Sequence, residues 1–329
     1  MLPHFLGIGA QKGGTTWLYH MLSVHPGVWL PPAKELHYLN QDPTAPKTFW
    51  HRLTGREPGN RRWRWLLKRR ILKTASALAF VGSGGRIVWS YGGRSNDKPW
   101  WLARLAALRR HPSKLVADAA WDLNFFCRRP TDAWYGTLFQ PGPDQVAGDI
   151  TPDYAGLSEP HVAHVRSLLP HAKIIFIMRD PIERTWSAAR MAARHGTLGL
   201  DDEARLLTFA RQDEPSLLSD YLRTLTIWEQ HYPSSQIFLA FFEELRDCPE
   251  ELLLRIYRFL GIEASKRYIP VYVRGKANIG ARQAMPKRFA SELARQHYPQ
   301  LQALHARFGG YTTKWLQSAE AILNGEGPG

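Results

Sequence analysis

A lysine, two glycines and two threonines follow one another near the start of the chain, in the stretch GAQKGGTTWL. These residue types suit an anion, because glycine lets backbone N–H groups approach a phosphate and hydroxyls and ammonium groups add to the binding. The usual nucleotide-triphosphate loop reads G-x-x-x-x-G-K-[ST], with its lysine after the last glycine. Here Lys12 comes before Gly13 and Gly14, and Thr15 and Thr16 follow. The stretch predicts a phosphate-binding loop of another kind, with a glycine-rich turn that binds nothing as the alternative.

A second candidate anion site combines Arg179 with Ser187. Arg179 directly follows the apolar run IIFIM, and Ser187 lies eight residues later in the helix that the next residues predict. An arginine presents a fork of donors and a serine hydroxyl adds another, so the two could bind one phosphate. Taken alone, this spacing also suits an ordinary surface pair of Arg179 with Asp180. Together with the loop at Lys12, it predicts two phosphate sites, which would fit a nucleotide phosphorylated at both ends of its ribose.

A dinucleotide-binding loop is an alternative that fits less well. That pattern needs G-x-G-x-x-G and an acid about 20 residues further on. Gly7 and Gly9 supply two glycines, but Lys12 stands where the third belongs, and Gly13 comes one residue late. Glu35 lies at the distance of the acid, yet no β-strand clearly delivers it.

The elements that must position these residues are strands alternating with helices. Buried strands are predicted at FLGI, from Phe5, at KIIFIM, from Lys173, and at QIFLAFFEEL, with amphipathic helices between and after them. This order implies a parallel sheet covered on both faces, whose ligands bind at the carboxyl ends of the strands. Lys12 and Arg179 both follow a strand at that end.

The composition favours an anionic partner. The chain has 329 residues, a formal net charge of +14 and a pI of about 9.9, which suits nucleic acid, a phospholipid surface, a nucleotide or an acidic polymer. Cys127 and Cys248 are too few for a disulfide framework and form no C-x-x-C metal motif. No secretory signal or spanning apolar run is visible, so we expect a cytoplasmic protein.

Residues 52–115 differ from the rest and are predicted to be a basic, aromatic-rich insertion. Seven Arg or Lys residues fall between Arg61 and Lys73, with tryptophans among them. Basic aromatic helices can lie on membranes or nucleic acid, so peripheral membrane contact stays open. A solvated basic face that packs its tryptophans on the core is the other interpretation.

The two loops together resemble those of the sulfotransferases that use 3′-phosphoadenosine 5′-phosphosulfate (PAPS). GAQKGGTTWL and IIFIMRDPIERTWSAA carry the resemblance, and KELHYLN, WYGTLFQPGPDQVAGDITPDYA and QIFLAFFEELRDCPEELLLRIYRFLGI are similar to segments of the heparan-sulfate, or carbohydrate, type. The resemblance covers most of the chain outside residues 52–115 and the C-terminal tail. The resemblance implies a single α/β domain over residues 1–329, with a P-loop NTPase-like three-layer fold in which helices flank a central parallel sheet.

The resemblance also implies roles for individual residues. The first loop would hold the 5′-phosphosulfate, with Lys12 facing the oxygen that bridges phosphate and sulfate and neutralising charge on the leaving phosphate. The second loop would hold the 3′-phosphate. The residues expected to contact the donor are Gln11, Lys12, Gly13, Gly14, Thr15, Thr16, Trp17, Arg179, Ser187, Lys276 and Arg282. Lys276 and Arg282 belong to a basic, Gly-rich stretch, VRGKANIGARQ, which a plain surface turn would explain equally well.

Glu35 matches the catalytic base of the heparan-sulfate type, and His37 matches a nearby histidine. If their segment is extended, both side chains point the same way, because alternate residues share a face. The alternatives are a salt bridge of Glu35 with Lys34 or an arginine, and a purely structural His37. The family often has an acid where this chain has Asn40. The motif DITPDY, from Asp149, is expected to shape the acceptor cleft without a chemical role.

The implied reaction moves a sulfuryl group from PAPS, without a metal, to a hydroxyl, or less often an amine, of a carbohydrate or glycoconjugate. It leaves adenosine 3′,5′-bisphosphate. A glycolipid at a membrane or an anionic polysaccharide would suit the basic insertion, and nucleic acid is not expected. A nucleotide kinase is the rival enzyme, which predicts ATP, Mg²⁺ and a lysine after the glycines, and that lysine is missing. A basic membrane- or nucleic-acid-binding module would leave the loops at Lys12 and Arg179 unexplained.

Overall fold

The computed structural model describes residues 1–40, 120–121, 123–125, 128, 130–194, 196–274 and 283–325. Leu2–Asn40 and Phe139–Gly329 form one compact unit, and Met1 with Gln41–Leu138 forms another. The insertion expected at 52–115 lies outside the described residues, so it stays a prediction, as does the single domain.

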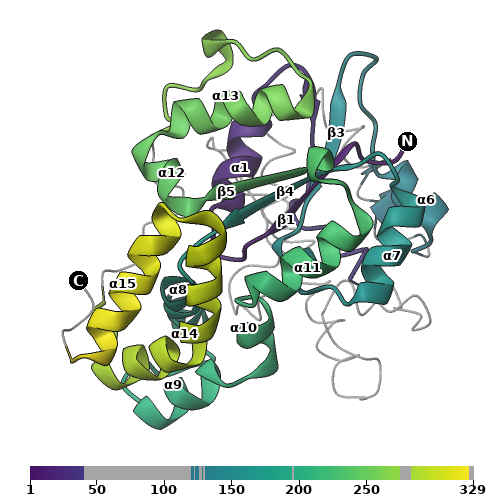
Figure 1. Ribbon diagram of the computed structural model, residues 1–329. Coiled ribbons are helices and arrows are strands. Elements are labelled where there is room, and N and C mark those ends of the chain that lie inside the picture. Colours follow the sequence, from purple (N-terminus) through teal and green to yellow (C-terminus); the bar gives the residue numbers. More distant parts are fainter. Residues whose placement is uncertain are drawn as a thin grey trace, which may run out of the picture. The chain divides into compact units, whose positions relative to one another are not determined.

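Five parallel strands form the sheet of the first unit, in the order β2-β3-β1-β4-β5 (Figure 1). The strands are β1 (Phe5–Gly9), β2 (Val28–Trp29), β3 (Val146–Ile150), β4 (Lys173–Met178) and β5 (Ile237–Phe241). β1 and β4, in the middle, are buried along nearly their whole length, as their unbroken apolar runs predict. The predicted central parallel sheet is confirmed.

Helices cover both faces of this sheet (Figure 1). On one face, apolar residues of α1 (Thr15–Leu22) and α13 (Pro249–Leu260) form a core with β1 and β4. On the other face lie α7 (Glu159–Leu168), α8 (Pro181–Arg194) and α11 (Tyr221–His231). The other helical segments of this unit are α9 (Glu203–Ala210), α10 (Asp213–Leu217), α12 (Phe242–Asp247), α14 (Lys287–Phe308), α15 (Tyr311–Leu323), and the short 3₁₀ turns η1 (Pro152–Gly156), η2 (Ser234–Gln236) and η3 (Lys266–Tyr268).

The described part of the second unit contains α6 (Asp132–Thr137). Thr131 caps this helix, since its Oγ1 accepts a hydrogen bond from the backbone N of Trp134 at 3.1 Å. Trp121, Phe125 and Trp134 form a small aromatic cluster, with ring centroids 5.0 and 5.7 Å apart. The cap and this aromatic cluster stabilise the short helix.

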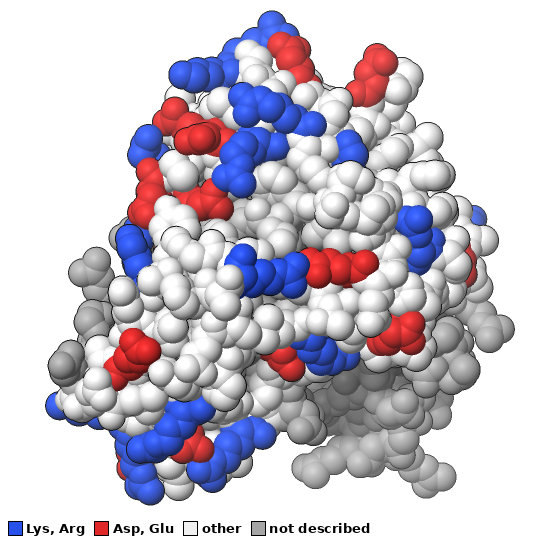
Figure 2. Space-filling model, in the orientation of Figure 1, with Lys and Arg blue, Asp and Glu red and all other residues white. Residues whose placement is uncertain are grey.

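The charged surface is mixed where the structure describes it. On the face in Figure 2, Lys and Arg lie among Asp and Glu rather than in one basic field. Residues 41–119 hold 17 Lys or Arg against 4 Asp or Glu, which is +13 of the +14 net charge. The rest of the chain is therefore close to neutral. Among the described residues, no helix is long and apolar enough to cross a membrane.

Candidate active site

The predicted phosphate loop lies between β1 and α1, at the carboxyl end of the strand. The backbone N of Ala10 donates to the Ile177 carbonyl of β4 at 2.7 Å, and Gly13 N donates to the Ala10 carbonyl at 2.9 Å. A Cβ on Gly13 would lie 2.6 Å from the Ile177 oxygen, so only glycine fits here. Lys12 and Gly14 have φ of +67° and +98°, which turns the chain into α1 at Gly14.

The other loop residues line the same turn. Thr15 and Trp17 are buried, while Gln11 and Thr16 are half-buried. A helix that begins directly after such a loop presents backbone N–H groups and the positive end of its dipole to an anion. The geometry therefore suits a phosphate at the start of α1.

Arg179 joins the two predicted anion loops. Its Nη1 donates to the Lys12 carbonyl at 3.1 Å, and its guanidinium lies 4.6 Å from the centroid of the Phe242 ring. Tyr221 fixes the backbone at this point, because its hydroxyl donates to the Arg179 carbonyl at 2.6 Å. The structure thus brings both loops together at one sheet edge. Ser187 lies two turns along α8 and is half-buried.

Asp180 is not the surface partner of Arg179 that the alternative interpretation proposed. Asp180 is buried and accepts a hydrogen bond from Ile182 N at 2.8 Å, so it caps the start of α8. Burial raises the pKa of its carboxyl to about 7. Arg179 pairs instead with Glu183, at 3.3 Å.

Lys12 lies among other cations. Its Nζ is 3.5 Å from the sulfur of Met191 on α8. Burial lowers its pKa to about 8, and Arg194, Arg179 and Arg184 lower it further, while Glu35 opposes them. An anion bound here would relieve this repulsion.

Three arginines of α8 were missed in the sequence analysis. Arg190 and Arg194 follow Ser187 by three and seven residues, so Ser187 and these two arginines share one helical face. Burial lowers the pKa of Arg190, and the charges of Arg179 and Arg194 lower it too, against Glu183. Arg184 is fully buried, and its charge lowers the pKa of Lys12. The helical spacing from Ser187 was the signal that could have found Arg190 and Arg194.

Glu35 and His37 meet, but not through an extended backbone. Their φ angles are +66° and +52°, so the expected strand-like alternation is wrong for this segment. His37 Nε2 nevertheless lies 3.8 Å from Glu35 Oε2, and the other oxygen, Oε1, is paired with the Lys34 ammonium. Glu35 is buried. The salt bridge with Lys34 that we weighed as an alternative is thus present beside the contact with His37.

The motif DITPDY holds this segment in place. Thr151 Oγ1 and the Tyr154 hydroxyl donate to the two oxygens of buried Asp149 at 2.8 and 2.7 Å. Burial, followed by the charge of Asp149, raises the pKa of Tyr154 well above its usual value. The Tyr154 oxygen in turn accepts from Leu39 N at 3.4 Å, which ties the Glu35–His37 segment to the end of β3. Asp153 lies 3.5 Å from His37 Nδ1, a contact that the sequence analysis missed.

Lys276 and Arg282 lie outside the described residues, so their predicted contacts stay predictions. The described chain on either side is held by two tryptophans. Trp17 Nε1 donates to the Val273 carbonyl at 2.9 Å, and Trp186 Nε1 donates to the Gln283 carbonyl at 3.3 Å. Val273 is thus hydrogen-bonded to α1 and Gln283 to α8, and these are the two helices that follow the anion loops.

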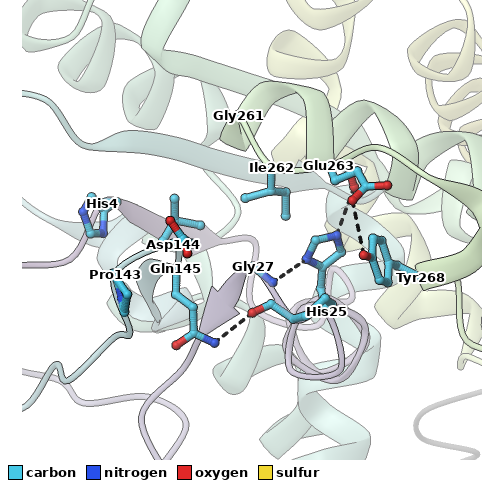
Figure 3. Close-up of a pocket in the computed structure, with 12 residues that line it drawn as sticks. His4, His25, Gly27, Pro143, Asp144, Gln145, Gly261, Ile262, Glu263 and Tyr268 are labelled. Atoms are coloured by element: carbon cyan, nitrogen blue, oxygen red, sulfur yellow. Dashed lines mark hydrogen bonds between the residues drawn. The ribbon is translucent and has the colours of Figure 1, made fainter.

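A hollow at the opposite edge of the sheet is a poor candidate for the active site (Figure 3). Its central residue, His25, uses both ring nitrogens structurally: Nδ1 accepts from Gly27 N at 3.0 Å and Nε2 lies 3.0 Å from the Glu263 carbonyl. Burial lowers the pKa of His25, which favours the neutral ring. Parallel sheets bind ligands at the other edge, where Lys12 and Arg179 lie.

No group of three His, Cys, Asp or Glu residues is placed to hold a metal ion within the described part of the chain. The predicted metal-free reaction remains a prediction.

The chain belongs to the sulfotransferase family, whose sequence model matches residues 3–266. Membership in this family supports the predicted sulfuryl transfer. A solved sulfotransferase from Alicyclobacillus acidocaldarius superposes with a TM-score of 0.56, at 18% identity, over 96% of this chain and 99% of that one. This likeness shows the fold, so the predicted P-loop-like α/β class is confirmed.

The curated relatives are heparan sulfate enzymes. The bifunctional heparan sulfate N-deacetylase/N-sulfotransferase 2 of Bos taurus is 28% identical over 159 residues, which are 45% of this chain and 17% of that protein. The bifunctional heparan sulfate N-deacetylase/N-sulfotransferase of Drosophila melanogaster is 28% identical over 121 residues, 33% of this chain and 11% of its own length. The matched segments are thus less than a fifth of either relative.

Proposed function

We propose that the donor is PAPS and that its two phosphate groups occupy the two loops. The observation that carries this proposal is the hydrogen bond from Arg179 Nη1 to the Lys12 carbonyl, at 3.1 Å. Arg179 and Ser187 bind the 3′-phosphate in this proposal. The backbone N–H groups of Gly13–Thr16 and the threonine hydroxyls bind the 5′-phosphate.

The chemistry follows from the charges at this edge. The Lys12 ammonium stabilises the negative charge that develops on the leaving phosphate as the bond from the bridging oxygen to sulfur breaks. Glu35 is the base that takes the acceptor's proton, and it lies near enough to Lys12 to act on its pKa. The base and the ammonium then flank the transferred group, as an in-line displacement requires.

The acceptor we propose is a hydroxyl or an amine of a carbohydrate or glycoconjugate. Two observations support this class: the similarity of KELHYLN to the heparan-sulfate type, and the named curated relatives. Because those relatives are N-sulfotransferases by name, the free amine is tested beside the hydroxyl.

Donor binding is the first test. We predict that adenosine 3′,5′-bisphosphate raises the melting temperature much more than ATP with Mg²⁺, because only the bisphosphate fills both loops. Lys12→Ala should weaken this shift and lower turnover about 10²–10³-fold, the usual effect of removing one charge-stabilising donor. Lys287→Ala, which removes an exposed lysine at the start of α14, is the matched control and should change neither. A larger shift with ATP and Mg²⁺ would favour a kinase instead.

The acceptor is identified with sulfur-labelled PAPS. The substrates compared are N-desulfated heparin, O-desulfated heparin and a neutral glycolipid in vesicles. Label on N-desulfated heparin but not on O-desulfated heparin would identify an amine, and label on the other two a hydroxyl. Bisphosphate binding with no transfer to any carbohydrate would contradict the acceptor class and leave the donor site standing.

A further inference from the structure

His37 lies between two carboxylates that come from different segments. Its Nε2 is 3.8 Å from Glu35 Oε2, and its Nδ1 is 3.5 Å from Asp153 Oδ2 in η1. An imidazole can take up a proton at one nitrogen while the other nitrogen donates to a neighbour. The ring is therefore placed to link the two acids.

The three side chains become steadily more exposed along this line. The exposed fraction is 8% for Glu35, 16% for His37 and 27% for Asp153. The line thus leads from the buried candidate base to the solvent. Sulfuryl transfer to a hydroxyl releases one proton: the acceptor O–H bond breaks as the O–S bond forms, and the bridging oxygen leaves with its electron pair on the phosphate. That proton has to leave a buried carboxyl.

The backbone around Asp153 is held independently of its contact with His37. Thr151 and Tyr154, on either side, both donate to Asp149, and Tyr154 accepts from Leu39 N. This network fixes η1 against the segment that carries His37. Removing the charge of Asp153 should therefore leave both segments in place.

Asn40 is the second neighbour of His37 Nδ1. Its Nδ2 lies 3.3 Å from that nitrogen. An amide can turn so that its oxygen accepts a hydrogen bond instead, once Nδ1 carries a proton. Asn40 can thus hydrogen-bond to Nδ1 in either protonation state of His37. Of these two neighbours, Asp153 is the one that adds a negative charge at Nδ1.

We propose that Asp153 is a positioning residue: it orients His37 toward Glu35 and stabilises the imidazolium that forms when His37 takes the acceptor's proton from Glu35. The proposal rests on the proposed function of Glu35 as the base. The proton passes from Glu35 Oε2 to His37 Nε2, which restores the carboxylate for the next turnover. The proton on Nδ1 then passes by way of Asp153 to solvent.

The surrounding charges agree with this assignment. Burial alone would lower the pKa of His37, but the carboxylates of Glu35, Asp153 and Asp149 outweigh it and raise the pKa. The charged groups on the ring's own segment are Lys34 and Glu35. Those on β3 and η1 are the two aspartates. His37 is thus set to hold a proton for part of the cycle.

The first test needs no acceptor. The imidazole of His37 is titrated by NMR in the full chain, in wild type and in Asp153→Asn. We expect a lower His37 pKa in the variant, because one stabilising carboxylate is gone, and an unchanged value in the control Asp144→Asn, which removes an exposed acid of the loop before β3. An unchanged titration in Asp153→Asn overturns the proposal.

The second test measures sulfuryl transfer from PAPS to N-desulfated heparin. Asp153→Asn should lower kcat about 10–100-fold, the usual cost of losing a partner that orients a functional group. It should leave the affinity for adenosine 3′,5′-bisphosphate unchanged and move the acid limb of the pH profile to lower pH. In a His37→Gln background the same change should have no further effect, since Asp153 acts through His37. A full effect in that background, or an unmoved acid limb, overturns the proposal.

The two proposals fail in different ways. If the donor assignment is wrong, the wild type does not prefer the bisphosphate over ATP. If only the role of Asp153 is wrong, the wild type binds the bisphosphate normally while the His37 titration ignores Asp153→Asn. If the wild type transfers no sulfuryl group to N-desulfated heparin, the NMR titration of His37 alone decides whether Asp153 has the proposed role.

Discussion

At the scale of single residues, the feature that matters most is the free-energy cost of protonating Lys12. Its ammonium is buried beside Arg179, Arg184 and Arg194, so its pKa falls to about 8. A lysine in this state is partly neutral just above physiological pH. A bound polyanion removes the repulsion and restores the full charge, so binding and protonation are linked.

We predict that the affinity for adenosine 3′,5′-bisphosphate falls as the pH rises through about 8. The free protein then has to take up a proton on Lys12 to bind, which costs up to about tenfold in affinity per pH unit. Isothermal titration calorimetry between pH 7.5 and 9.5 measures the slope. Lys12→Arg, whose guanidinium stays charged over this range, should give a nearly flat profile. A flat profile for the wild type would contradict the linkage.

The sequence located the residues whose place follows from strand ends alone. Lys12 lies in the loop after one predicted strand and Arg179 directly follows another, and the carboxyl ends of parallel strands share one edge. Arg194 and Asp153 could not be found in this way, because their neighbours depend on where α8 and η1 pack. The left-handed φ of Glu35 also has no signal in the chain, since tertiary contacts impose it.

At the scale of elements, the predicted phosphate loop is hydrogen-bonded to the neighbouring strand, β4. Ala10 N donates to the Ile177 carbonyl of β4, and Gly13 packs against the same oxygen. The loop therefore takes its shape from β4 as much as from its own residues. This contact also explains why the loop after β4, with Arg179, lies next to it.

Gly13→Ala tests this contact. The new Cβ would lie 2.6 Å from the Ile177 oxygen, a backbone atom that cannot swing away, so the loop has to move off β4. We expect a loss of about 1–3 kcal/mol in the free energy of unfolding, as for other overpacked sites, and weaker bisphosphate binding. Urea unfolding measures the first effect. Gly142→Ala, where the nearest atom is a side-chain oxygen at 3.4 Å, is the control, and an equal loss there would refute the argument.

At the scale of the whole molecule, charge and catalysis lie in different stretches of the chain. Nearly all of the net positive charge falls in residues 41–119, while the candidate site is built from strands and helices outside them. The alternating strand and helix pattern was enough to predict the sheet. The C-terminal pair α14 and α15 was not predicted, because their packing against each other and of α14 against α8 is a long-range contact.

His297, buried in α14, links this packing to pH. Burial, followed by the charge of Arg184, lowers its pKa to about 4 in the folded protein, against about 6.5 when unfolded. The unfolded chain therefore binds the extra proton between these values, so stability is complete above pH 6.5 and is lost as the pH falls toward 4. The loss is roughly 3 kcal/mol for this group.

Urea unfolding at pH 7 and pH 4.5 measures this loss. His297→Leu should lose less stability between the two pH values than the wild type. His305→Leu, which changes an exposed histidine of the same helix, should lose as much as the wild type. An equal loss in all three proteins would show that His297 is charged in the fold.

The contact between Arg179 and the Lys12 carbonyl has one more consequence. Because the Arg179 guanidinium comes from one turn and is hydrogen-bonded to the other, the two ends of the proposed donor would not be recognised independently. A phosphate bound at one turn would order the other turn. Two ligands that each carry one of the phosphate groups should therefore bind more tightly together than either does alone. Donor selection would then depend on the presence of both groups in a single molecule, and a nucleotide with only one of them would bind weakly.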